Sequence, residues 1–190
     1  MNKNKIVFTF ATAEVNFIGQ IFIKITELLT GKLKLKKLYD EYLSENRPPE
    51  LFWDDAVDKL NFTLITNFQD GSYIPKKGKL IVIANHAFGV ADGVSICSAI
   101  SKVRQDYKMV THKVLRQAEA VKDKILPIDF NENREALLTN INTRKEAEKV
   151  LHNEGVLVLF PSGTIATKQN LKMNTKADDG EWKQWVSKLV

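Results

Sequence analysis

Leu80–Ile100, with the sequence LIVIANHAFGVADGVSICSAI, joins a strand pattern to a group of polar residues. Its first four residues, Leu80 to Ile83, are apolar without alternation, which predicts a strand covered on both faces. Small residues around Gly89 follow, and Asp92 then opens an apolar segment that predicts a buried helix. A strand, a polar loop and a helix in this order are typical of the sites of α/β proteins.

Two polar residues of this stretch, His86 and Asp92, are separated by five residues, so a bent loop can bring their side chains together. A carboxylate bonded to one ring nitrogen of a histidine fixes the tautomer and leaves the other nitrogen basic. The alternative is structural: His86 ends the strand and Asp92 caps the helix. Both interpretations stay open on these two residues alone.

A second stretch, Gly155–Ala166, has the sequence GVLVLFPSGTIA. Val156–Phe160 is another continuous apolar run, which predicts a buried strand, and a Pro-Ser-Gly-Thr turn follows it. Gly163 allows backbone N–H groups to approach a ligand, and two hydroxyl groups add short donors, which suits a phosphate or an oxyanion. An ordinary turn after a core strand is the alternative.

Together, the motifs NHxxxxxD and FPSGT resemble those of the glycerolipid acyltransferases, the superfamily of lysophosphatidic acid and glycerol-3-phosphate acyltransferases. The segment ANHAFGVADG is most similar in sequence to the bacterial branch called hemolysin-like or lyso-ornithine-lipid acyltransferase. Ile125–Asp129, ILPID, resembles the intermediate block of that family. The resemblance extends from Leu29–Tyr39 to Trp182 and therefore covers most of the chain.

The resemblance implies a role for individual residues. His86 is then the general base, and Asp92 orients it. Acceptor binding is assigned to Asn85, Phe160, Pro161, Ser162, Gly163, Thr164 and Lys168. The acyl donor is acyl-CoA or an acyl-carrier protein, the acceptor is a lysophospholipid, glycerol 3-phosphate or a lyso-aminolipid, and no other cofactor is expected.

Two positions depart from the main branch of the family. Ser162 stands where that branch has Glu, and Ile165 stands where it commonly has Arg. An arginine is a fork-shaped phosphate ligand, so its loss changes how a phosphate could be held. Either another cation such as Lys168 supplies the charge, or the acceptor is not a simple phosphomonoester.

Composition narrows the class of protein. The chain has 190 residues, which predicts one domain with a substantial core, and a formal net charge of +5, which favours an anionic partner. Its single cysteine, Cys97, excludes an internal disulfide and a cysteine-based metal site and predicts a buried apolar role. No ligand cluster predicts a metal, and the basic residues lack the interleaved aromatic residues of nucleic-acid binding.

The N-terminal region is predicted to be a separate helical part, residues 1–45, ahead of an acyltransferase-like domain, residues 46–190. Apolar residues at spacings of three and four between Val15 and Leu29 predict an amphipathic helix, and a lysine cluster from Lys32 to Lys37 follows. Lys24 and Glu27 argue against a transmembrane span. The helix either lies on an anionic membrane, which predicts a peripheral protein at the cytoplasmic face of the inner membrane, or packs on the domain itself.

The remaining pattern predicts an α/β fold with a mainly parallel central sheet flanked by helices. Strands are expected at Thr63–Thr66, Leu80–Ile83, Tyr107–His112, Ile125–Ile128 and Val156–Phe160. Helices are expected at Leu35–Leu43, Leu51–Phe62, Val94–Ile100, Leu115–Lys122, 133–153 and Glu181–Val190. Residues 167–180 read as a mobile surface loop. Family members usually continue past this point, so we expect a truncated or minimal form.

Acyl transfer by general-base catalysis is the function that these observations favour, and two alternatives come from other classes. An esterase or thioesterase would use Ser162 as the nucleophile and His86 as the base, although the chain lacks a G-x-S-x-G elbow. A non-catalytic lipid-binding or membrane-binding module would bind anionic vesicles and transfer nothing.

Overall fold

The computed structural model describes residues 32–65, 73–167 and 176–189. The helix predicted between Val15 and Leu29, and the candidate binding residue Lys168, lie outside these ranges. The division between residues 1–45 and 46–190 stays a prediction. Among the residues described, no helix is long and apolar enough to cross a lipid bilayer.

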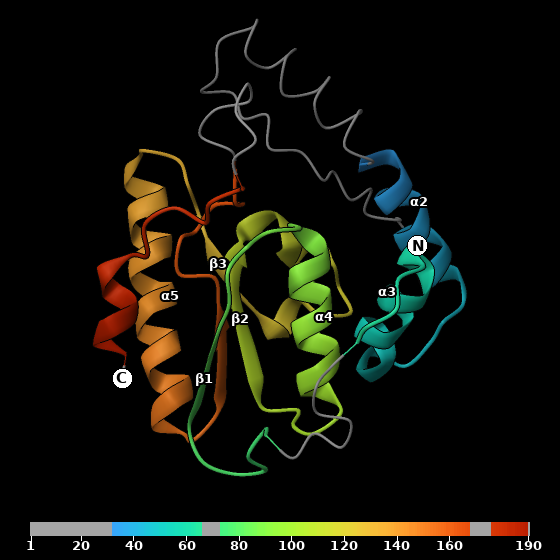
Figure 1. Cartoon of the computed structure of the whole chain (residues 1–190), viewed down its shortest axis with the longest axis horizontal. Helices are drawn as coiled ribbons and strands as arrows, with labels where there is room; N and C mark the ends of the chain where they lie inside the picture. Colours follow the sequence, from blue (N-terminus) through green and yellow to red (C-terminus); the bar gives the residue numbers. More distant parts are fainter. Residues whose placement is uncertain (1–31, 66–72, 168–175, 190) are drawn as a thin grey trace, which may run out of the picture.

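Four parallel strands form the sheet in the order β1-β4-β2-β3 (Figure 1). They are β1 Leu80–Ile83, β2 Tyr107–His112, β3 Ile125–Ile128 and β4 Val156–Leu159. Ile83 at the end of β1 pairs with Leu159 at the end of β4, so the loops after these strands leave the sheet side by side. The predicted α/β fold with a mainly parallel sheet is confirmed.

Helices cover both faces of the sheet (Figure 1). The α-helices are α2 Lys32–Ser44, α3 Phe52–Leu60, α4 Val90–Ser101 and α5 Arg134–His152, and the 3₁₀ helices are Pro49–Leu51, Lys113–Gln117, Lys122–Lys124 and Gln184–Lys188. Val156 and Val158 of β4 belong to the core shared with α2, α3 and α4, whereas Leu157 and Leu159 belong to the core shared with α5. The alternation of a strand places successive side chains on opposite faces, so β4 contributes to both cores.

The strand before His86 packs against the cores on both faces of the sheet, as its sequence predicts, but its cover is incomplete. Leu80 and Val82 pack against the core shared with α2, α3 and α4, and Ile81 packs against the core shared with α5. β1 lies at the edge of the sheet, its residues are half-buried or exposed, and 46% of Ile83 is accessible to solvent. The strand that is buried along its whole length is β4. An apolar run indicates that a strand can be buried. It does not predict the place of that strand in the sheet, because strand order depends on pairing between distant segments, here β1 with β4.

Three other elements differ from their predictions. Residues 63–65 form no strand, and Ile65 is exposed instead of paired. The helix predicted at Leu115–Lys122 is replaced by two 3₁₀ helices. The backbone at Ala118 is extended and interrupts the helix, and the side chains of Ala118 and Val121 are buried in the core. The helix predicted at Glu181–Val190 is one 3₁₀ helix, Gln184–Lys188, because Lys183 is still extended and donates its N–H to Pro161 O at 2.9 Å.

At the amino end of the sheet, Arg104 joins the starts of three strands. Its guanidinium group donates to both carboxylate oxygens of Asp106, at 2.9 and 2.6 Å, just before β2. It also donates to Pro75 O and Gly78 O before β1 and to Glu154 O before β4, at 2.6–3.2 Å. Only 5% of Arg104 is exposed, and these five contacts use the whole donor set of an arginine.

Cys97 lies in the centre of α4 and is completely buried. Its Sγ lies 3.7 Å from Met109 Sδ, and burial raises the pKa of the thiol to about 12. The predicted role of Cys97 as a small apolar core residue is confirmed.

Candidate active site

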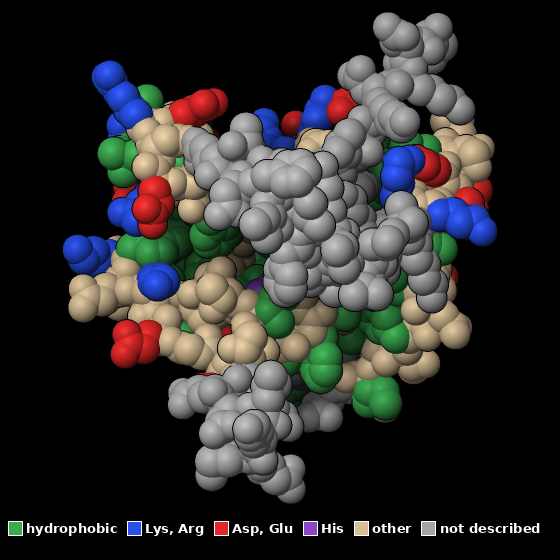
Figure 2. Space-filling view, turned by 90° about the horizontal axis from the view of Figure 1, so that it is seen from above, with side chains coloured by type: hydrophobic (Ala, Val, Ile, Leu, Met, Phe, Trp, Pro, Cys, Tyr) green, Lys and Arg blue, Asp and Glu red, His purple; other side chains and the backbone are tan. Residues whose placement is uncertain are grey.

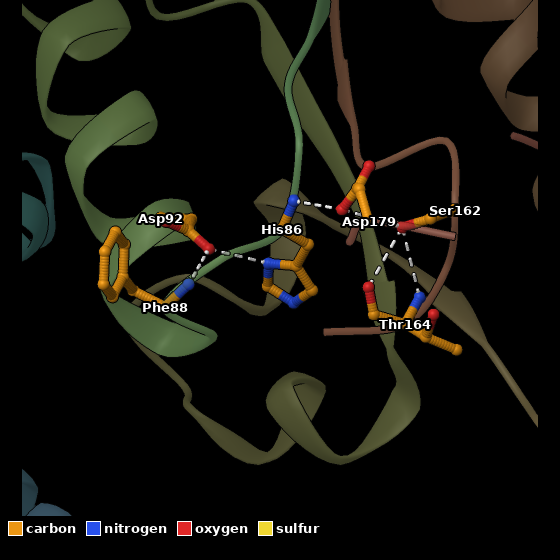
Figure 3. A network of polar contacts seen from close by, with 6 residues as sticks. All are labelled: His86, Phe88, Asp92, Ser162, Thr164 and Asp179. Atoms are coloured by element: carbon orange, nitrogen blue, oxygen red, sulfur yellow. Dashed lines mark hydrogen bonds and ion pairs between the residues drawn. The ribbon is translucent and has the colours of Figure 1, made fainter. Parts of the chain in front are cut away.

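The imidazole of His86 lies where the loop after β1 turns into α4 (Figure 3). Its Nδ1 is 3.0 Å from Asp92 Oδ2, and its ring stacks on Phe160 with centroids 4.3 Å apart. The side chains of His86 and Asp92 are 20% and 15% exposed, so solvent reaches the pair but does not surround it. The proximity expected from the motif spacing is present, and the structure adds the aromatic support of Phe160.

Asp92 also organises the start of α4. Its Oδ2 accepts the main-chain N–H of Phe88 at 2.8 Å, and it lies in the first turn, where the helix dipole favours a carboxylate. The turn needs Gly89, whose φ is +62° and whose missing Cβ would lie 3.2 Å from Ile165 Cδ1. The catalytic and structural interpretations of Asp92 are therefore compatible, because one oxygen serves the helix start and the imidazole.

The turn after β4 holds its own polar groups. Ser162 is 3% exposed, and its hydroxyl lies 3.0 Å from Thr164 O, to which it donates. Gly163, with φ +71°, donates its N–H to Phe160 O at 3.0 Å. These groups stabilise the turn, whereas Gly163 and Thr164 themselves are exposed, and Thr164 lies on the His86 side of the turn (Figure 3). The donors expected from Ser162 and from the Gly163 N–H are thus used within the protein.

The residue that sequence reasoning missed is Asp179 (Figure 3). Its Oδ1 accepts the main-chain N–H of His86 at 2.6 Å and lies 3.3 Å from Ser162 Oγ. Its Oδ2 accepts the indole N–H of Trp182 at 2.9 Å. The described residues of the predicted surface loop, Thr167, 176–178 and Gly180, are exposed, and an antiparallel bridge between Thr167 and Asp178 brings the partly buried Asp179 back to the site.

A scan against protein-family models matches residues 65–181 to the family described as Acyltransferase, which is more than half of the chain. The chain belongs to the acyltransferase family. The matched range includes the His86–Asp92 pair, the turn at 160–164 and Asp179. Comparisons with curated proteins and with solved structures gave no match.

Two remaining candidates of the acyltransferase site are placed differently. Asn85 is exposed next to His86, and Lys168 lies outside the described residues.

A second histidine, His112, ends β2, where its ring stacks on Phe130 with centroids 5.5 Å apart and its Nδ1 accepts the N–H of Val114. Burial lowers the pKa of His112, and its Nδ1 caps a 3₁₀ helix, so this histidine has a structural role.

Exposed apolar side chains lie in the segments that follow β1, β3 and β4. Phe88 is 80% exposed at the turn between His86 and Asp92, and Val90, Phe130 and Ile165 are each about half exposed. Ile165 packs toward Gly89. Figure 2 looks onto this end of the molecule, where hydrophobic side chains and a histidine are visible between the parts that are not described. Across the described ranges, no three His, Cys, Asp or Glu side chains gather in a way that could hold a metal.

Proposed function

We propose that this acyltransferase moves a fatty acyl group from acyl-CoA or an acyl-carrier protein to a hydroxyl group of a lysophospholipid, glycerol 3-phosphate or a lyso-aminolipid. The observation that carries the proposal is the 3.0 Å contact between His86 Nδ1 and Asp92 Oδ2 beside an exposed turn. A carboxylate at Nδ1 directs the other ring nitrogen, Nε2, toward the proton of an acceptor hydroxyl.

The reaction then proceeds without a covalent intermediate on the protein. His86 Nε2 takes the proton of the acceptor hydroxyl while the hydroxyl oxygen attacks the carbonyl carbon of the donor thioester. The new C–O bond forms, the C–S bond breaks, and the imidazolium returns the proton to the leaving thiolate. Asp92 stabilises the imidazolium between these steps and holds the ring in place.

Acceptor binding is assigned to the turn after β4. Phe160 supports the imidazole, and the exposed Gly163 and Thr164 form the surface next to it. Asn85, Pro161, Ser162 and Lys168 complete the binding set carried over from the family resemblance. The apolar side chain at Ile165 favours an acceptor whose uncharged part lies closest to α4.

A serine hydrolase receives less support from the same geometry. The hydroxyl of Ser162 is buried and donates to Thr164 O, and its second neighbour is the Asp179 carboxylate. A nucleophilic serine instead needs an exposed oxygen within hydrogen-bond reach of its base. Ser162→Ala is therefore expected to retain more transfer activity than His86→Ala.

The second candidate function is a lipid-binding module without catalysis, which the 80% exposure of Phe88 favours. We place either form peripherally at the cytoplasmic face of the inner membrane, with an anionic lipid surface as partner. Sedimentation with vesicles of phosphatidylglycerol measures this binding separately from transfer. Vesicle binding by a folded chain that transfers nothing would establish the module and reject the enzyme.

The decisive experiment measures transfer of a labelled acyl group from acyl-CoA and from acyl-carrier protein to a panel of lysolipids and to glycerol 3-phosphate. Replacing His86 with Ala should reduce the rate by about 10²–10⁴-fold, because the general base is lost. His152→Ala is the matched control, since His152 is exposed at the end of α5, and it should keep the wild-type rate within about twofold. A folded His86→Ala protein with the wild-type rate would reject this mechanism.

A further inference from the structure

The carboxylate of Asp179 connects three separate parts of the site (Figure 3). One contact is the main-chain N–H of His86, which is 93 residues away in the sequence, and the second is the hydroxyl of Ser162 in the turn after β4. The third is the indole N–H of Trp182. The side chain is thus the point at which the loop after β1, the turn after β4 and the C-terminal segment meet.

We propose that Asp179 is a positioning residue that sets the distance between the base and the acceptor-binding turn. This inference rests on the proposed function, in which His86 is the base. The main chain of His86 is held on both sides by the segment after β4, because Asp179 accepts its N–H at 2.6 Å and Ala166 donates to its C=O at 2.6 Å. Asp92 then fixes the ring.

This distance matters because proton transfer requires the base and the hydroxyl to lie within about 2.6–3.2 Å. The imidazole belongs to the loop after β1, whereas the proposed acceptor-binding turn belongs to the loop after β4. Asp179 Oδ1 touches both loops, through His86 N–H and Ser162 Oγ. Losing this connection leaves the main chain of His86 held to the segment after β4 by the Ala166 N–H alone, so the two loops can shift relative to each other. A misplacement of about 1 Å can reduce a rate by about 10²-fold.

Position 179 requires a carboxylate, because an amide cannot accept hydrogen bonds at both of its polar atoms. Oδ1 and Oδ2 of Asp179 both face N–H donors, from His86 on one side and Trp182 on the other. An asparagine has one acceptor oxygen and one NH₂ group, so in either orientation its NH₂ would face a donor. The usual conservative replacement is therefore expected to be damaging, and the damage should depend on the indole N–H of Trp182.

The kinetic test compares four variants with the wild type. Asp179→Asn should lower kcat by about 10²-fold, because the base is misplaced. It should leave KM for the acyl donor within about twofold, because the substitution does not change the residues that bind the acyl donor. Trp182→Phe alone should have a small effect, and the double variant Asp179→Asn, Trp182→Phe should recover about tenfold of the lost kcat, since the amide then meets only one donor. Glu181→Gln makes the same chemical change at an exposed neighbour and should keep the wild-type kcat.

The outcomes separate this inference from the proposed function. If the wild type transfers acyl groups and folded Asp179→Asn keeps its kcat, the positioning role is rejected while the acyltransferase stands. If the wild type transfers nothing, the proposed function fails, and amide hydrogen exchange of His86 decides the role of Asp179. Exchange in Asp179→Ala should then accelerate at least tenfold at His86 with the core amides unchanged. Unchanged exchange at His86 would reject the inference.

Discussion

Two charged side chains, Arg104 and Asp179, join separate segments of the chain at opposite ends of the same sheet. Arg104 donates to carbonyl groups that precede β1 and β4 and to Asp106 before β2. Asp179 accepts from the loop after β1 and lies against the turn after β4. The same two neighbouring strands are therefore fastened at both ends, by a donor at one end and by an acceptor at the other.

The two ends differ in what they leave available to a ligand. The guanidinium of Arg104 is enclosed and all its donors are used, so this end has a structural role. At the carboxyl end the imidazole of His86 is partly accessible, Thr164 is exposed and Phe88 protrudes. The groups that stabilise the fold and the groups of the proposed chemistry therefore lie at opposite ends of the strands.

The largest effect on stability is expected at the closed end. Arg104→Met should lower the free energy of unfolding by about 3 kcal/mol or more, because three main-chain carbonyl groups lose a buried donor. Urea unfolding monitored by circular dichroism measures this change. The protein that remains folded should keep its transfer rate, since Arg104 lies at the end of the sheet opposite to His86.

Arg116→Met is the matched control for this variant, because Arg116 is an exposed arginine. Its free energy of unfolding should stay within about 0.5 kcal/mol of wild type. Equal losses in the two variants, or a transfer rate that falls with Arg104, would contradict the separation of the two ends.

The opposite pattern is expected for Asp92→Asn at the open end. An amide can present its NH₂ group to His86 Nδ1 and stabilise the wrong tautomer, so transfer should fall by about 10²-fold. The free energy of unfolding should fall by less than about 1 kcal/mol, which is the usual size of a helix-dipole contribution. Steady-state kinetics and urea unfolding on the same sample test both statements, and a loss of stability that explains the lost activity would count against them.

The smallest effect is a pH dependence of the closed end. Hydrogen bonds from the Arg104 guanidinium lower the pKa of the Asp106 carboxyl group in the folded protein. The pair therefore stabilises the fold above the unfolded pKa of about 3.9 and loses this contribution as the pH falls through the lower folded value. Because the Asp106 side chain is 54% exposed, Asp106→Asn should cost less than about 1 kcal/mol at pH 7.

Urea unfolding at pH 7 and at pH 3 measures this dependence. The difference between wild type and Asp106→Asn should shrink at the lower pH, as the wild-type carboxyl group begins to take up its proton. A difference that grows as the pH falls would show that Asp106 stabilises the fold through another contact.

Local patterns were sufficient for the parts of the fold that depend on neighbours in the sequence. The strands at Tyr107–His112 and Ile125–Ile128 have the predicted bounds. The long helix predicted at 133–153 is confirmed as Arg134–His152, and the side chain of Asn133 caps its start by accepting the N–H of Ala136. The motif spacing also showed that a bent loop could bring His86 and Asp92 together, since both lie in one strand–loop–helix unit, and the two side chains do meet.

Tertiary partners explain what the sequence could not predict. The polar composition around Asp178 and Asp179 is that of a solvated loop, and nothing within it indicates a contact 93 residues away. Periodicity likewise could not show that β4 separates β1 from β2 and leaves β1 at the edge. The one available signal for Asp179 was indirect: Trp182, three residues later, is an aromatic residue in a polar tail, and its indole N–H is a donor that a nearby carboxylate can accept.

The buried position of Cys97 makes the protein a ready-made background for site-specific labelling. Burial raises the pKa of the thiol to about 12, so the thiol stays protonated at neutral pH, and its sulfur is enclosed between α4 and β2. A maleimide dye will therefore react with a cysteine introduced at an exposed position such as 88, while the native thiol remains unmodified. A fluorophore at that position would report directly on what approaches the imidazole, without any need to replace the native cysteine.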